Sequence, residues 1–147
     1  RPSPRRADMK PPAFIKKIPG ADRKRRGNPE ADLQRVVVST LRQVLPKGFV
    51  VHHSANEVRR GGEDGRVAQG IAQGMGVHPG FSDLLVLGSG RCLFLELKSK
   101  TGRLSDAQVE FREFVVREGH AWALVRSLDD ALKALSDNHF PTRIKGG

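Results

Sequence analysis

Residues 80–108 read GFSDLLVLGSGRCLFLELKSKTGRLSDAQ, and this stretch decides the fold. It holds two apolar runs, 84–87 and 92–97, separated by a glycine-rich segment at 88–90. Short apolar runs joined by such a segment predict two β-strands in a hairpin. Along the second run both alternating faces are largely apolar, which predicts a central strand covered on both sides.

Three charged residues of this stretch stand at the strand ends that lie away from the turn. Asp83 precedes the first strand, and Glu96 and Lys98 close the second. Antiparallel pairing from this turn places Asp83 close to Glu96. Two adjacent carboxylates repel unless a cation lies between them, and Mg²⁺ prefers such oxygen ligands. A lysine beside that metal suits a phosphate substrate. The alternative is a Glu96–Lys98 salt bridge on an exposed strand, with Asp83 capping a turn; the hairpin and the helix that follows favour the metal site.

The remaining patterns complete an α/β order of α-β-(α)-β-β-α-β-α, with a mixed central sheet flanked by helices. Asn28 is a suitable N-cap for the first helix, and Ser105 and Ser127 are suitable N-caps for two later ones. We expect these further elements: a helix over 29–45, a strand over 49–55, a weak helix near 66–75, a helix over 105–119, a strand over 121–127 and a helix over 127–137.

Composition and charge favour a polyanionic partner. The 147-residue chain has a formal net charge of +10 and a sequence pI near 10.6. Residues 1–27 hold ten basic and two acidic residues, and these charges leave +8 in this segment. The segment predicts either a solvated extension or a phosphate-binding arm. We therefore expect a basic, flexible tail over 1–27, one folded domain over 28–138 and a short tail over 139–147.

Several classes of protein do not fit the composition. The single cysteine, Cys92, excludes an internal disulfide and a multi-cysteine zinc site. No apolar run is long enough for a membrane span, and no signal-peptide pattern opens the chain. We expect an intracellular protein of the host cytoplasm, associated with the nucleoid in a prokaryote, that is not secreted, binds no membrane and needs no small-molecule cofactor.

The combination of an Asp, a hairpin and Glu-x-Lys resembles the PD-(D/E)XK nucleases, and within them the virus-type replication-repair nuclease (VRR-NUC) family in its small stand-alone viral form. GFSDLLVL resembles that family's Gly-x-Pro-Asp-Leu strand, with Ser82 where the motif usually has Pro. LFLELKSKTGRLSDAQVEF resembles its Glu-Leu-Lys, Gly, Leu-Ser-x-x-Gln block. EADLQRVVVSTLR, HHSANEVRR and EGHAWALVRSLDDAL resemble its opening helix, its His, Asn and Arg stretch, and its closing strand and helix. The resemblance covers about residues 29–135.

The resemblance implies a restriction-endonuclease-like core and a role for each matching residue. Asp83 and Glu96 would bind Mg²⁺ or Mn²⁺, together with the carbonyl of Leu97. Lys98 would be the catalytic lysine. Gln108 would be the motif glutamine on the helix beside the site. A final acid, Glu30, would come from the first helix and reach the metal or its water.

The implied activity is metal-dependent endonucleolytic hydrolysis of DNA, on branched substrates such as a Holliday junction or a flap, in replication, recombination or repair. Resolution of a four-way junction needs two symmetric cuts, so we expect a homodimer. Two alternatives are a non-catalytic nucleic-acid-binding module and a sequence-specific restriction-type nuclease on the same core. Basic and polar residues outside the core are candidate DNA contacts: Arg23, Lys24, Arg25, Arg26, Asn56, Arg59, Arg60, Lys100 and Arg103.

Overall fold

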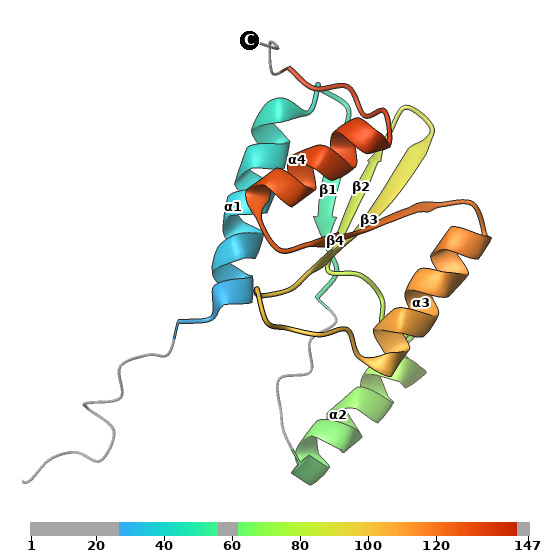
Figure 1. The fold of residues 1–147 in the computed structure, drawn as a ribbon. Helices are drawn as coiled ribbons and strands as arrows, with labels where there is room; N and C mark the ends of the chain where they lie inside the picture. Colours follow the sequence, from blue (N-terminus) through green and yellow to red (C-terminus); the bar gives the residue numbers. More distant parts are fainter. Residues whose placement is uncertain (1–26, 56–61, 144–147) are drawn as a thin grey trace, which may run out of the picture.

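The structure is a computed structural model that describes residues 27–55 and 62–143 (Figure 1). Its elements follow the predicted α-β-(α)-β-β-α-β-α order and confirm the expected fold class. They are α1 (Pro29–Val44), β1 (Val50–His53), α2 (Gly62–Gly74), β2 (Leu84–Gly88), β3 (Arg91–Leu97), α3 (Asp106–Arg117), β4 (Ala121–Val125) and α4 (Leu128–Asp137). The expected boundaries hold to within a few residues. The proposed 1–27 tail lies almost wholly outside the described residues, which begin at Gly27.

The four strands form one mixed sheet in the order β1-β2-β3-β4. β1, β2 and β3 are antiparallel, and β4 runs parallel to β3. The hairpin turn contains only Ser89 and Gly90, whose φ angles are 51° and 71°. Two successive positive φ values are the geometry of a type I′ turn, which suits the right-handed twist of the paired strands. The turn thereby fixes the β2–β3 register, in which Leu84 pairs with Leu95.

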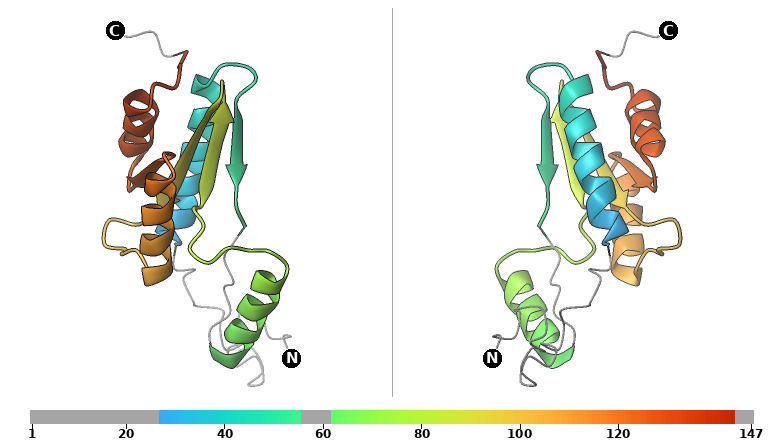
Figure 2. Two further views of the ribbon diagram at one scale, coloured as in Figure 1. Left: turned by 90° about the vertical axis from the view of Figure 1, so that its right-hand side faces the viewer. Right: turned by 90° about the vertical axis from the view of Figure 1, so that its left-hand side faces the viewer.

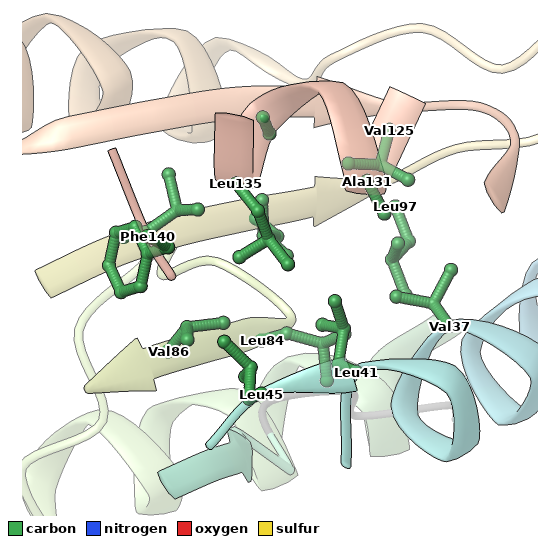
Figure 3. Close-up of a cluster of buried hydrophobic side chains, with 13 residues drawn as sticks. Val37, Leu41, Leu45, Leu84, Val86, Leu97, Val125, Ala131, Leu135 and Phe140 are labelled. Atoms are coloured by element: carbon green, nitrogen blue, oxygen red, sulfur yellow. The ribbon is translucent and has the colours of Figure 1, made fainter. Parts of the chain in front are cut away.

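One face of the sheet is covered by α1 and α4, and the main hydrophobic core lies between them and the strands (Figure 3). The alternation of β3 directs Leu93, Leu95 and Leu97 into this core, as their complete or near-complete burial shows. The two helices contribute Val37, Leu41, Ala131, Ala134 and Leu135. The predicted central strand is therefore confirmed on this face.

The other face of β3 packs against α3 through aromatic rings. Phe94 of β3 lies 5.6 Å from Phe111 of α3 between ring centroids, and Phe81 contacts both rings. Phe114, also on α3, is exposed. This packing holds α3 on the face of β3 from which Glu96 projects.

The helix α2 stands apart from these layers. Figures 1 and 2 show it beyond the sheet, at the end from which β2 starts. Its exposed apolar side chains include Val67 and Ile71. Among the described residues, no helix combines the length and apolarity needed to cross a bilayer.

Candidate active site

Asp83 and Glu96 lie opposite each other at one end of the sheet. Since Leu84 pairs with Leu95, the next positions outward are Asp83 and Glu96. The Oδ2 atom of Asp83 accepts a hydrogen bond of 2.8 Å from the backbone N–H of Leu97. The hairpin thus brings the two predicted metal ligands together, and the strand that carries Glu96 also orients Asp83.

The Glu96 carboxyl is buried, with only 2% of the residue exposed. Burial, together with the charge of Asp83 and a hydrogen bond between the two side chains, raises its pKa to about 9. The charge of Lys98 acts in the opposite direction and lowers this pKa. Without a cation, the pair is therefore stabilised when Glu96 keeps its proton.

Gln108 connects Glu96 to the start of α3. Its side-chain amide donates to Glu96 Oε1 at 2.7 Å, and its side-chain oxygen accepts from the Ser105 N–H at 2.8 Å. The Ser105 hydroxyl in turn accepts from the Gln108 N–H at 3.2 Å. This reciprocal pair is a capping box, which begins α3. The sequence LSDAQ therefore sets both the helix terminus and the position of Glu96.

Glu30 reaches the same end of the sheet from α1. Asn28 caps that helix and Pro29 occupies its first turn, so Glu30 falls in the first turn as well. Glu30 Oε1 accepts a hydrogen bond of 3.3 Å from the Ser99 N–H, just beyond β3. Its charge also raises the pKa of Glu96. The predicted acid of the first helix therefore lies near enough to Glu96 for their charges to interact.

Lys98 immediately follows β3 and is half-buried. Its backbone N–H donates to the carbonyl oxygen of Val125 at 3.0 Å, so the pairing with β4 continues past the last assigned residue. The structure thus places all five predicted catalytic residues at one end of the sheet: Glu30, Asp83, Glu96, Lys98 and Gln108. Their roles remain predictions.

The segment that leads into β2 packs closely against the start of α3 at one glycine, to which the sequence analysis assigned no role. Gly80 has a φ of +74°, and a Cβ atom there would lie 2.1 Å from the backbone oxygen of Ala107. Only glycine permits this contact, which places the chain before Asp83 against the start of α3. A glycine three residues before the acid was the available sequence signal.

The donor set fits a hard divalent cation. Asp83 and Glu96 supply carboxylate oxygens, and protein N–H groups hold one oxygen of each carboxylate in place. The raised pKa of Glu96 shows that positive charge beside the carboxylate pair is stabilising, and a divalent ion bound there would supply it. Across 27–55 and 62–143, no cluster of three or more His, Cys, Asp or Glu side chains forms a ready metal site. The fit therefore rests on the carboxylate pair, and the Leu97 carbonyl and Glu30 stay predicted further ligands.

The candidate DNA contacts divide into two groups. Lys100 and Arg103 are exposed on the segment between β3 and α3, close in sequence to Lys98. The others, Asn56, Arg59, Arg60 and residues 23–26, lie outside the described residues. His52 and His53 are both exposed, and His53 lines a groove of about 540 Å³ beside α1.

Two solved structures share this fold. One, described as a "VRR_NUC domain protein", is 23% identical over 76% of this chain and 88% of its own, with a TM-score of 0.59. Another, described as a "VRR_NUC domain", is 19% identical over 78% of this chain and 100% of its own, with a TM-score of 0.52. No family model and no curated protein matches the sequence. The chain therefore has the fold of the VRR_NUC domain.

Proposed function

We propose that the protein is a metal-dependent endonuclease that hydrolyses phosphodiester bonds in DNA. The observation that carries this proposal is the meeting of Asp83, Glu96 and Lys98 at one end of β2 and β3. A carboxylate pair and a lysine at one point suit a phosphate ester, since they combine a cation site with a fixed positive charge. The VRR_NUC fold and the net charge of +10 support the same substrate class.

Each side chain has a defined part in the proposed reaction. A divalent ion bound by Asp83 and Glu96 would supply Lewis-acid stabilisation of the phosphate and lower the pKa of a water molecule. Lys98 stabilises the negative charge that develops on the phosphate oxygens as the bond to the leaving oxygen breaks. Gln108 holds Glu96 in the orientation that this arrangement needs.

We further propose that the substrate is branched DNA and that two copies of the chain act together. One chain offers one such site, whereas resolution of a four-way junction needs two cuts on opposing strands. A two-fold homodimer meets this requirement with two identical sites. Each copy would then cut one of the two strands.

The helix α2 supports a second copy as the partner. Val67 and Ile71 of α2, and Met75 just after the helix, recur every four residues and are 59%, 60% and 83% exposed. The Met75 N–H still donates to the Ile71 oxygen at 3.0 Å, so Met75 continues the helical spacing. Residues at this spacing share one helix face. The three consecutive valines of α1 give little support, because Val37 is buried and Val38 packs against the core. Only Val36 of these three is exposed.

A cleavage assay with three labelled substrates tests the function. Linear duplex, flap and four-way junction DNA are each incubated with Mg²⁺, Mn²⁺ or EDTA. The proposal predicts cleavage only with a divalent ion, and faster cleavage of the branched substrates in several unrelated sequences. Binding without cleavage in every metal would instead indicate a non-catalytic module. Cleavage confined to one sequence would indicate a restriction-type enzyme.

A further inference from the structure

Arg126 directly follows β4 and reaches across to the segment that leaves β3. Its Nη1 atom donates to the backbone oxygen of Ser99 at 2.5 Å and to that of Gly102 at 2.8 Å. One guanidinium group thus binds both ends of the 99–102 turn. The turn is also closed internally, because the Gly102 N–H donates to the Ser99 hydroxyl at 3.0 Å.

The same turn contacts two residues of the candidate site. The Ser99 N–H donates to Glu30 Oε1 at 3.3 Å, and Lys98 is the residue immediately before the turn. Space there is limited, since a Cβ atom on Gly102 would lie 3.2 Å from Glu30 Oε1 and 3.4 Å from Lys98 Cδ. A displacement of the turn would therefore move both side chains.

Arg126 is itself fixed by the start of α4. Its backbone N–H donates to Asp130 Oδ2 at 2.9 Å, and the Asp130 N–H donates to the hydroxyl of Ser127, the N-cap of that helix. The chain of contacts therefore runs from the α4 terminus, through Arg126, to the turn and then to the site.

We propose that Arg126 is a positioning residue for the cleavage site: by holding the 99–102 turn it sets Glu30 and Lys98 relative to the Asp83–Glu96 pair. This inference rests on the proposed nuclease function. Arginine suits the task because its planar group carries several donors in fixed directions and stays charged. A lysine at 126 presents a single ammonium group on a flexible chain, so it holds the two carbonyl oxygens less rigidly.

The test compares R126Q with R143Q. Arg143 is a matched control because it also donates to a backbone carbonyl, that of Leu45, at the C-terminal end of α1. Mn²⁺ binding is measured by titration calorimetry without DNA, and cleavage is measured at saturating DNA. For R126Q we expect weaker Mn²⁺ binding and slower cleavage, each by about 10- to 100-fold, as for residues that orient metal ligands. R143Q should change neither, and R126K should recover part of both.

A second variant perturbs the turn without changing its charge, and a glycine substitution on α2 is its control. G102A introduces a methyl group against Glu30 and Lys98, whereas G74A on α2 meets no atom within 4 Å. We expect G102A to weaken Mn²⁺ binding and G74A to leave it unchanged.

Two results separate this proposal from the nuclease proposal. A wild-type protein that cuts no DNA would overturn the function, and the Mn²⁺ titrations would still decide the role of Arg126. An R126Q protein that melts at a lower temperature but, below its transition, binds Mn²⁺ and cuts DNA like the wild type has lost only stability. That outcome would overturn the positioning role.

Discussion

Gln108 donates a hydrogen bond of 2.7 Å to Glu96 Oε1 while its own side-chain oxygen closes the capping box of α3. One side chain therefore links the start of a helix to the buried carboxyl of the candidate site. The two tasks use different atoms, the amide nitrogen for Glu96 and the oxygen for the Ser105 N–H, so they can be separated by mutation.

Replacement of Gln108 by Glu should impair cleavage while leaving the helix cap intact. A glutamate oxygen still accepts from the Ser105 N–H, but the variant offers no amide to Glu96 and adds a third carboxylate beside it. We expect a fall of about 10-fold or more in cleavage rate with little change in helix content, measured by kinetics and circular dichroism. Q108A, which loses both contacts, should also lower the melting temperature. Equal cleavage by Q108E and the wild type would show that the Glu96 contact is unimportant.

The metal-free protein should lose stability as the pH rises towards 9. The folded state keeps a proton on Glu96 up to about pH 9, whereas the unfolded chain releases it near the ordinary glutamate pKa of about 4.3. Because the folded state binds more protons between these values, its stability falls as the pH rises through this interval. Thermal melts in EDTA should show this fall, and Mg²⁺ should reverse it at pH 8.

E96Q is the variant that isolates this effect. It has no proton to release at position 96, so its melting temperature in EDTA should depend less on pH than that of the wild type. D129N, which changes an exposed acid of α4, should keep the wild-type slope. Parallel slopes for E96Q and the wild type would contradict the assignment of the raised pKa to Glu96.

Ser82 occupies the position at which the Gly-x-Pro-Asp-Leu motif usually has proline. We expect this serine to lower the stability of the folded protein. It is fully buried, and its hydroxyl has no hydrogen-bond partner among the described residues. A buried hydroxyl without a partner is destabilising by about 1–3 kcal/mol. S82A should therefore raise the melting temperature by roughly 3 °C or more without slowing cleavage. S136A, at an exposed position of α4, is the control, and the higher helix propensity of alanine limits its gain in stability to about 0.5 kcal/mol. A lower melting temperature for S82A would show that its hydroxyl is paired.

The hairpin and its register were predictable because they depend on local chemistry. The alternation of side chains along each strand and the short glycine-containing turn are enough to place Asp83 opposite Glu96. The contact of Glu30 with the Ser99 N–H joins residues 69 positions apart, and only the resemblance assigned Glu30 to the site. The contacts of Arg126 with the 99–102 turn were not predicted. Their acceptors are backbone carbonyls, which every residue has, so no residue type in the sequence indicates them.

The sequence also did not predict which faces of the helices are exposed. Three consecutive valines on α1 cannot show which one faces the sheet, because that depends on how the helix is rotated against the core. The structure buries Val37, packs Val38 partly and exposes Val36. The exposed apolar stripe of α2, which contains Val67 and Ile71, was likewise not predicted, because its segment is rich in glycine.

Substitution on α2 should separate the proposed dimer into monomers. I71D places a charge in the middle of the exposed stripe, whereas V36D places one on α1 as a matched control. Light scattering at micromolar concentration should give twice 16.2 kDa for the wild type and V36D, and 16.2 kDa for I71D. I71D should still nick DNA but lose paired cuts on four-way junctions. A wild-type monomer that makes paired cuts would contradict this arrangement.

Cleavage by K98A, measured beside DNA binding, tests the central claim most directly. Lys98 is one charge among twenty-six Lys and Arg residues, so its loss should change affinity little. K47A is the control, because Lys47 is exposed and precedes the strand end that lies away from the site. With Mg²⁺, the account predicts that K98A binds DNA like the wild type but no longer cuts it, whereas K47A does both. Cleavage by K98A at a rate near that of the wild type would contradict it.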